Sequence, residues 1–353
     1  MSTLPLPGGM DINGLAVKRG DLFVARNRRL TVTIVLVRDV GSRPRHFIMK
    51  AVAPYPAPGK PSGWDRYAVA LRFLFSWFGT VAVLRTIDQA TNTGPPLLQP
   101  LWTLLLKRWP SSLSQPGFGG VIGLVSFFLS CVGFSVLDLM RSSTKIQKDV
   151  WPSARDMLRA GGPQLLIYTV LNILGWSLDQ HIALPRHAPS LATVAAEVLV
   201  AFCIGDFLIY SQHRMMHAVP FLRKHIHSWH HAYMAPFSWA GGVVHPLEDA
   251  IVVGTQVVAP LALGHHPLSF WLFVAIWVAL LIEEHSGHDV WWAPYNWMPF
   301  ASPVGGGAAP HDIHHYKVTK NFGFVLVVWD VLFGTYEPVV EPPNSPGRLM
   351  LHS

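Results

Sequence analysis

HRMMHAVPFLRKHIHSWHH (residues 213–231) places six of the chain's eighteen histidines within nineteen residues. Histidine titrates near neutral pH, and each ring carries two nitrogens that need a partner. The stretch contains two boxes, HRMMH (213–217) and HSWHH (227–231), and a third box, HDIHH (311–315), follows about eighty residues later. His225 falls on a different helical face from His227, so we expect it to be structural.

The three boxes share a spacing that suits metal binding. In a helix, positions i, i+3 and i+4 lie on one face, so each box is expected to aim all its imidazoles in one direction. The box histidines are His213, His217, His227, His230, His231, His311, His314 and His315. Eight are too many for one four-coordinate zinc and suit two metal ions. Imidazole binds iron, zinc, copper or nickel, so the spacing alone leaves the metal open.

Other polar residues near the boxes are candidates for supporting roles. Asp206, Tyr210, His213 and His217 form one helical stripe, and Asp206 is expected to accept a hydrogen bond from an imidazole and fix its tautomer. His285 follows an apolar segment and is a candidate ninth ligand. The supporting candidates are Asp206, Tyr210, His245, Glu248, His288 and Asp330. Asp206, Glu248, Glu283 and Glu284 are expected to offset positive charge on the metal ions, and Asp330 to anchor a loop or an imidazole.

The composition indicates a membrane protein. Half of the residues are hydrophobic and only 13% are charged, whereas a soluble domain carries about 25% charged residues. The fourteen tryptophans fit a chain that meets the membrane–water interface. The net charge of +7 then indicates cytosolic loops and anionic headgroups rather than nucleic acid.

The apolar segments predict how the boxes meet. Candidate membrane segments are residues 66–86, 117–137, 161–178 and 189–210. Two further runs, Ala250–Gly264 and Pro267–Ile282, are each about four residues short of the roughly 20 that cross a bilayer and are expected to form a helical hairpin. The hairpin would return the chain to the side it left, which brings HDIHH to the first two boxes.

The predicted fold class is therefore all-α, an integral membrane helical bundle with a histidine-rich catalytic cap. A short strand is expected in RLTVTIVLV (29–37) of the N-terminal tail. The expected domains are a basic tail at 1–62, N-terminal membrane helices at 63–188, a catalytic domain at 189–340 and a C-terminal tail at 341–353.

The membrane setting favours iron. A metal site beside a bilayer meets hydrocarbon substrates, and attack on an unactivated C–H bond requires oxygen activated at a redox metal. Zinc would be expected for hydrolysis or structure. The alternative class is a non-enzymatic zinc-binding membrane protein or carrier. A carrier should have ionisable residues lining several spans, whereas these histidines lie at segment ends and in loops.

Several motifs together resemble the fatty acid hydroxylase superfamily, in particular its sterol C-4 methyl oxidase, cholesterol 25-hydroxylase and sterol desaturase members. Besides the three boxes, the matching stretches are DFLIYSQHRMMH (206–217), APFSWAGGVVHPLE (235–248), EEHSGHD (283–289) and NFGFVLVVWDVLFGTYEP (321–338). The resemblance covers residues 189 to 338. The HSG element and the spacing to HDIHH look closest to the sterol-acting branch.

The resemblance implies a multi-pass membrane protein of the endoplasmic reticulum whose histidine boxes face the cytosol. It implies two irons per chain, held by the eight box histidines and His285, with no catalytic residue beyond the metal centre. His288 follows HSG and is implied either to coordinate or to hydrogen-bond in place of the usual residue. Electrons would come from NAD(P)H through cytochrome b5 and its reductase. The implied substrate is a sterol or related terpenoid, hydroxylated or desaturated; the alternative is a fatty acyl or sphingolipid substrate.

Overall fold

The computed structural model describes residues 22–27, 30–35, 63–91, 96–177, 181–293 and 306–338. The chain divides into two compact units, Met1–Pro58 and Gly59–Ser353. In the first unit, β1 (Leu22–Asn27) and β2 (Leu30–Val35) pair antiparallel, with Leu22 opposite Val35. The strand expected in RLTVTIVLV is confirmed by β2, whose β-branched residues favour an extended backbone. The domain boundaries at 62, 188 and 340 stay a prediction.

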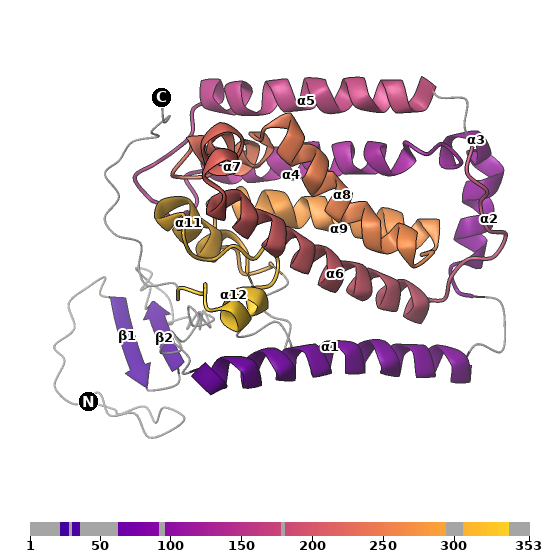
Figure 1. Cartoon of the computed structure of the whole chain (residues 1–353), viewed down its shortest axis with the longest axis horizontal. Coiled ribbons are helices and arrows are strands. Elements are labelled where there is room, and N and C mark those ends of the chain that lie inside the picture. Colours follow the sequence, from indigo (N-terminus) through magenta and orange to yellow (C-terminus); the bar gives the residue numbers. More distant parts are fainter. Residues whose placement is uncertain are drawn as a thin grey trace, which may run out of the picture. The chain divides into compact units, whose positions relative to one another are not determined.

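The regular secondary structure among the described residues of the second unit is helical, apart from one isolated bridge, and this confirms the all-α fold class for that unit (Figure 1). The elements are α1 (Gly63–Thr91), α2 (Gln99–Arg108), α3 (Pro110–Leu113), α4 (Phe118–Leu139), α5 (Ala154–Ser177), α6 (Leu191–Ala218), α7 (Pro220–His225), η1 (His227–Ala232), η2 (Ser238–Gly242), α8 (Pro246–Ala262), α9 (Pro267–His285), α11 (Ala308–Lys317) and α12 (Val328–Phe333).

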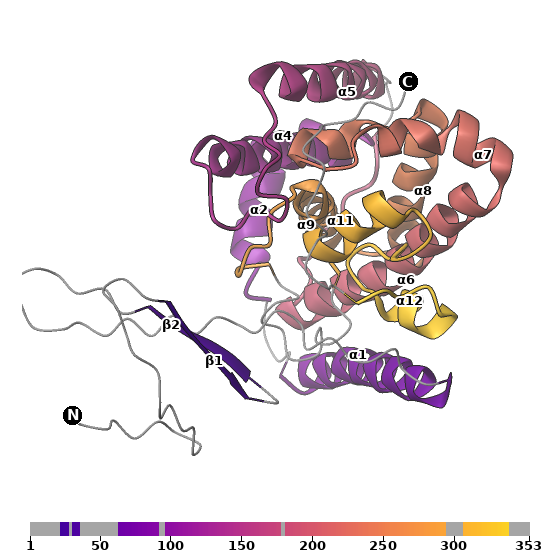
Figure 2. The same ribbon diagram turned by 90° about the vertical axis from the view of Figure 1, so that its left-hand side faces the viewer.

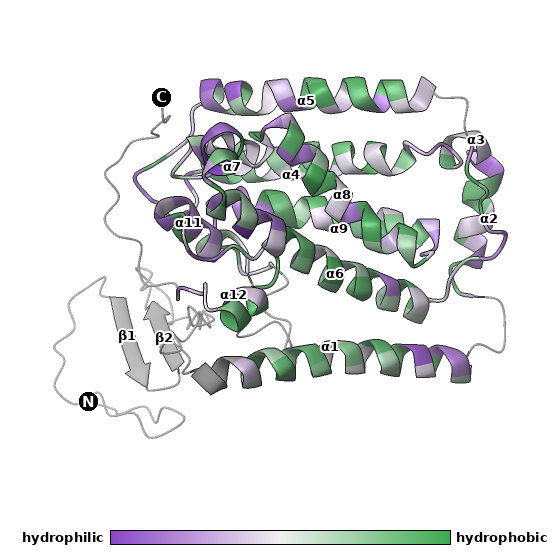
Figure 3. Cartoon of the chain, in the orientation of Figure 1, coloured by the Kyte–Doolittle hydropathy of each residue, from purple (hydrophilic) through white to green (hydrophobic). Residues whose placement is uncertain are grey.

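Among the residues that the structure describes, four helices are long and apolar enough to cross a membrane: Tyr67–Ala90, Phe118–Leu139, Leu191–Ala218 and Pro267–His285. Many of their large apolar side chains face outward, including Phe75, Phe128 and Leu129. A soluble protein rarely exposes so much contiguous apolar surface, so these faces meet lipid. Figure 3 shows the apolar middle of α4, α6 and α9 and the hydrophilic end of the unit at α7 and α11.

One expectation about the spans needs correction. Residues 161–177 of the expected segment lie in α5, which is long but not among the four apolar helices, because Gln164 and Asn172 lower its hydropathy. The run from Pro267 reaches a spanning length through its flank, since α9 has 19 residues and continues through Glu283, Glu284 and His285. The hairpin itself is confirmed: α8 and α9 are joined by a turn in which Gly264 has φ 62°.

Small residues let the central helices approach closely. Helix α4 packs along α9, and α6 packs against α1, α8 and α9 (Figure 2). A side chain at Gly205 of α6 would come within 2.9 Å of the Trp277 ring of α9, which is fully buried. Inside a bilayer such packing, rather than water exclusion, holds helices together. The close contact of α6 and α9 aligns the ends of both helices, where histidines lie.

Candidate metal centre

Four elements carry nine histidines to one end of the helix bundle. Helix α6 brings His213 and His217 in its last turns, η1 follows after a sharp reversal, α9 ends at His285, and α11 carries the third box. The reversal occurs because Val219 is extended before Pro220, which cannot continue α6 and opens α7 instead. All nine histidines expected as ligands therefore lie together.

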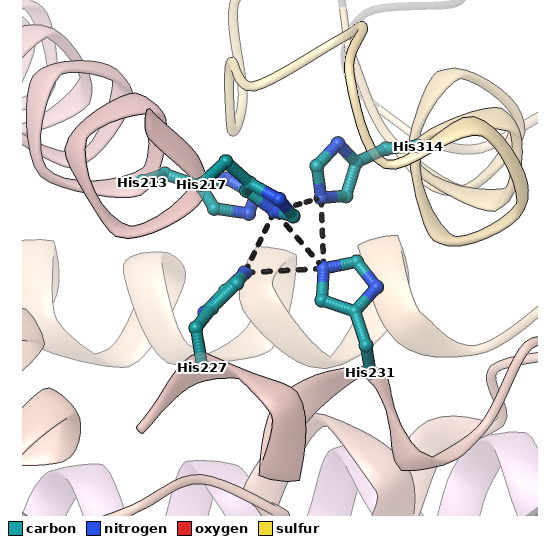
Figure 4. A group of neighbouring side chains, drawn as sticks. All are labelled: His213, His217, His227, His231 and His314. Carbon is teal, nitrogen blue, oxygen red and sulfur yellow. Dashed lines mark hydrogen bonds between the residues drawn. The ribbon is translucent and has the colours of Figure 1, made fainter. Parts of the chain in front are cut away.

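The imidazoles form two groups. The first group consists of His213, His217, His227, His231 and His314, and the second of His230, His285, His311 and His315. Within each group, one nitrogen of every ring lies within 4.8 Å of the corresponding nitrogen of every other ring. Figure 4 shows the first group, in which five rings from α6, η1 and α11 point toward one another.

The ring nitrogens within the groups lie at short distances. In the first group, the Nε2 atoms of His217 and His227 are 2.8 Å apart, and those of His231 and His314 are 3.2 Å apart. In the second group, His311 Nε2 lies 2.9 Å from His285 Nε2 and 3.0 Å from His315 Nε2.

The expectation that each box aims all its histidines in one direction is wrong. The second box contributes His227 and His231 to the first group and His230 to the second. The third box also divides, with His314 in the first group. In both boxes the histidines four residues apart share a group, His227 with His231 and His311 with His315, while the histidine three residues after the first, His230 or His314, lies in the other group. Each of these two boxes therefore links both groups.

The opposite ring nitrogen of most of these histidines is fixed by an oxygen. The Nδ1 contacts are His213 to Phe322 O (3.0 Å), His227 to Glu248 Oε1 (2.6 Å), His285 to Leu281 O (2.7 Å), His311 to Glu284 Oε1 (3.0 Å), His314 to Lys320 O (2.7 Å) and His315 to Tyr233 O (2.9 Å). Five of these contacts are hydrogen bonds, and because the carbonyl and carboxylate oxygens accept, Nδ1 carries the proton in His213, His227, His285, His314 and His315. The Nε2 atoms of these five rings are then bare lone pairs directed at the interior of each group. The His311 contact with Glu284 is close but lacks hydrogen-bond geometry.

This arrangement fits bound cations. Burial, with the neighbouring histidines adding to it, lowers the pKa of His311, His314 and other box rings well below its ordinary value, so these rings are neutral. The Nε2 atoms of His285 and His315, whose protons are on Nδ1, both face His311 Nε2, which can donate to only one of them and leaves the other lone pair unpaired. The Nε2 atom of His213 is also buried without a hydrogen-bond partner among the described residues. A metal ion in each group would satisfy these nitrogens.

Asp206 does not contact an imidazole, and that expectation is wrong. Its Oδ1 accepts from the backbone N–H groups of Val325 (2.7 Å) and Leu326 (3.2 Å), and its Oδ2 from Trp329 Nε1 (2.8 Å). The reason is its depth, since it lies two helical turns before His213 on α6. Asp206 instead holds the segment that presents Phe322 O to His213.

Tyr210 and Asp330 also hold this segment. The Tyr210 hydroxyl pairs with Thr335 Oγ1 at 3.0 Å and accepts from Arg214 at 3.0 Å, rather than contacting a histidine. Asp330 accepts from the backbone N–H groups of Phe322 (2.8 Å) and Gly323 (2.6 Å) and from the Thr335 hydroxyl. Burial raises the pKa of Asp330 to about 6. Of its two expected roles, Asp330 therefore takes the loop anchor.

We expect Asp206→Ala to destabilise the protein. The variant leaves three buried N–H donors without an acceptor, and each such loss costs about 1–3 kcal/mol. The midpoint of thermal unfolding in detergent should fall by about 5–10 °C. Asp149→Ala, at an exposed position, is the control. Equal midpoints for the two variants would contradict the anchoring role.

His288 lies outside both histidine groups. Gly287 has φ 68° and turns the chain away from His285. The His288 Nε2 lies 3.0 Å from Asp138 Oδ1 and its Nδ1 lies 2.9 Å from Thr144 Oγ1, while Lys145 Nζ donates to the same Asp138 oxygen at 2.7 Å. Of the two implied roles, the structure therefore gives His288 hydrogen bonding, and it ties the end of α4 to the segment after α9.

His245 is also outside the two groups. It is the N-cap of α8, and its Nδ1 accepts from the backbone N–H of Leu247 at 3.2 Å. Its ring contacts Trp229 with centroids 4.9 Å apart. By contrast, Glu248, three residues later, contacts His227 directly. A supporting role is thus given to Glu248 and not to His245.

Most of the groups that orient the histidines could not be predicted from the sequence. Four of the six Nδ1 partners are backbone carbonyls, which every residue possesses. A further buried contact joins Gln147 Nε2 to Asp312 Oδ1 at 2.8 Å, between the loop before α5 and the third box. Asp312 lies inside HDIHH, so its position marks it, but nothing in the sequence pairs it with Gln147.

A cavity of about 570 Å³ reaches both histidine groups. His213 and His227 of the first group and His230, His285 and His311 of the second line it. Its walls are mainly apolar side chains and glycines of α4, α5, α6, α8 and α9. The cavity therefore offers an apolar molecule a place against the ring nitrogens.

Comparison with known proteins identifies the family. Residues 198–335 match the fatty acid hydroxylase family. The rat (Rattus norvegicus) cholesterol 25-hydroxylase is 30% identical over 249 residues, which cover 68% of this chain and 82% of that protein. A zebrafish (Danio rerio) cholesterol 25-hydroxylase-like protein is 29% identical, covering 69% of this chain and 92% of its own length.

A third relative has a different printed activity. A rice (Oryza sativa subsp. indica) very-long-chain aldehyde decarbonylase is 35% identical over 150 residues, covering 42% of this chain and 54% of that protein. No solved structure matches the chain. With its apolar helices, its paired histidine groups and these relatives, the chain belongs to the fatty acid hydroxylase family and is a membrane-bound oxidoreductase.

Proposed function

We propose that this protein hydroxylates a sterol or a related terpenoid lipid at a centre of two iron ions. The observation that carries the proposal is the apolar cavity between membrane helices that ends on ring nitrogens of both histidine groups. The similarity to cholesterol 25-hydroxylases supports the lipid class. One ion would be held by His213, His217, His227, His231 and His314, and the other by His230, His285, His311 and His315.

Bound iron would supply the activation of dioxygen that attack on an unactivated C–H bond requires. The protein supplies the rest. Glu248 accepts the Nδ1 proton of His227, so this ring keeps Nε2 free for a metal, and Glu284 Oε1 lies 3.0 Å from His311 Nδ1. Apolar side chains such as Val274 and Val278 line the cavity and exclude water from the lipid chain. The two carboxylates also offset the charge of a centre with neutral ligands.

We further propose an electron donor, a cellular location and a membrane orientation for this enzyme. Reducing equivalents come from NAD(P)H through cytochrome b5 and its reductase, and the protein resides in the endoplasmic reticulum with its histidines facing the cytosol. The hydrophilic end of the bundle at α7 and α11 supports this orientation, because an electron donor has to approach the centre from water (Figure 3). Removal of a second hydrogen atom from the lipid would give a double bond instead of an alcohol.

Lipid profiling of a host that expresses the chain tests this function. We expect a lipid with one additional oxygen atom in cells with the wild-type chain and not in cells with His314→Ala. Growth under ¹⁸O₂ should place the label in the new hydroxyl group. Identical lipid profiles for the wild type and His314→Ala, at equal expression in the membrane, would refute the proposed function. If the oxidised product is a fatty acyl or sphingoid lipid, the proposed reaction stands and the proposed sterol substrate is wrong.

A further inference from the structure

Three polar side chains interrupt the apolar wall of the cavity on one side. Tyr168 Oη of α5 donates to Asp249 Oδ1 of α8 at 2.8 Å, and Gln164 Nε2 of α5 approaches Asp249 Oδ2 at 3.3 Å. All three line the cavity. The Tyr168 ring is fixed by an edge-on contact with Phe127, with centroids 5.8 Å apart. A carboxylate is thus held in a defined orientation across the wall between two helices.

This polar group lies beside the histidines. The consecutive residues Gly241 and Gly242 separate the two: a side chain at Gly242 would come within 3.0 Å of Gln164, and one at Gly241 within 3.1 Å of the His285 ring. Asp249 also directly follows Glu248, which contacts His227. A lipid that reaches the histidines through the cavity therefore passes this carboxylate.

The charge of the cavity restricts what can bind. Glu248, Asp249 and Glu284 line it, and among the described residues no lysine or arginine does. An anionic headgroup, such as the carboxylate of a free fatty acid, would meet like charges in a medium of low dielectric constant. A hydroxyl group can instead donate to a carboxylate, and a hydrogen bond to a charged acceptor is among the stronger ones in proteins. A carboxylate at such a place in a membrane protein is expected to serve a function.

A second observation indicates that the ligand carries a polar atom. Gln212, next to His213 on α6, also lines the cavity, and 7% of its surface is exposed. Its Nε2 is buried without a hydrogen-bond partner among the described residues. A buried donor left unpaired is costly, and an oxygen atom of a bound lipid would pair it. A pure hydrocarbon could not pair the Gln212 amide.

We propose that Asp249 accepts the hydroxyl proton of a neutral lipid alcohol in this cavity, with Tyr168 and Gln164 as positioning residues that orient its carboxylate. This inference rests on the proposed function for the identity of the cavity as the lipid site. It selects neutral alcohols over hydrocarbons and over fatty acid anions. A site built to bind a hydroxyl group rejects an analogue that lacks it, because its own polar atoms are then unpaired.

Binding measurements on the metal-loaded, full-length protein in nanodiscs test this inference. The probes are two matched pairs, cholesterol with cholest-5-ene and hexadecan-1-ol with hexadecane, together with palmitate. We expect at least one alcohol to bind roughly ten- to a hundredfold more tightly than its hydrocarbon partner. Palmitate should bind more weakly than the preferred alcohol. The absence of any alcohol preference in both pairs, or tighter binding of palmitate, would overturn the inference.

Three variants test which side chains bind the hydroxyl group of the alcohol. Asp249→Leu removes the acceptor and should lose the alcohol preference while keeping binding of the hydrocarbon, and Tyr168→Phe should lose part of the preference. Thr169→Val removes a hydroxyl from the exposed side of the same helix as Tyr168 and should keep the full preference. Metal content equal to the wild type shows that each variant retains the centre. An unchanged preference in Asp249→Leu would refute the role of Asp249.

Different results would refute the hydroxyl site and the proposed function. If the hexadecanol pair shows the Asp249-dependent preference and the cholesterol pair does not, the sterol substrate is wrong and the hydroxyl site stands. If alcohols bind as expected but no host lipid is oxidised, the proposed function is wrong and the hydroxyl site again stands. Product formation without any preference for alcohols would refute the hydroxyl site but not the proposed function.

Discussion

Replacing His314 or His230 by alanine is expected to abolish product formation. The two residues belong to different groups, so His314→Ala removes a nitrogen from the first group and His230→Ala from the second. In each variant the remaining rings of the group still face the proposed metal position, but one of the nitrogens that would bind the ion is missing. The loss should exceed the roughly 10- to 100-fold effect that is typical when only an outer hydrogen-bond partner of a metal ligand is removed.

The measurement is product formation by purified protein supplied with lipid, oxygen and reductant. His225→Ala provides a matched control, because His225 is exposed on α7 and lies outside both groups. Insertion into the membrane should be unchanged in all three variants, since the spans do not depend on these rings. Wild-type activity in either His314→Ala or His230→Ala would remove the residue from the proposed centre.

Glu248→Leu is expected to have the second largest effect. Glu248 Oε1 accepts the Nδ1 proton of His227 at 2.6 Å, and both side chains are almost fully buried. Leucine fills a similar volume but leaves Nδ1 of His227 without an acceptor, so the ring can carry its proton on Nε2 instead and lose its free lone pair. We expect a roughly 10- to 100-fold loss of metal affinity or activity.

Glu248→Gln separates the two contributions of this carboxylate. The glutamine Oε1 can still accept from His227 Nδ1, so the tautomer is kept while the negative charge is lost. Activity should therefore lie between those of the wild type and Glu248→Leu, and iron affinity should follow the same order in a chelator titration. Wild-type activity and affinity in Glu248→Leu would show that His227 does not need this partner.

The sequence predicted the elements of the site better than the arrangement within it. The histidine boxes and the apolar runs indicated helices, and the even number of segments between the boxes indicated that they meet. These signals depend on residue type and spacing, which the sequence contains directly. All nine histidines expected as ligands do lie together in the structure, including His285.

The parts of the site that the sequence did not predict depend on tertiary contacts. His230 belongs to the other group from His227, and His314 to the other group from His311, a division that the spacings HSWHH and HDIHH do not reveal. Asp206 lies on the expected stripe of α6 but binds the backbone before α12, because that segment folds back from more than a hundred residues away. Tyr168 and Asp249 likewise meet across 81 residues and gave no signal in the sequence.

Metal analysis of the purified wild-type protein tests the central claim most directly. The account predicts about two iron ions per chain by elemental mass spectrometry, because the nine histidines form two groups with at least four nitrogens each. His314→Ala and His230→Ala should each retain about one ion, since each disturbs a single group. Stable zinc in place of iron, or a single ion per chain that both variants lose, would contradict the account.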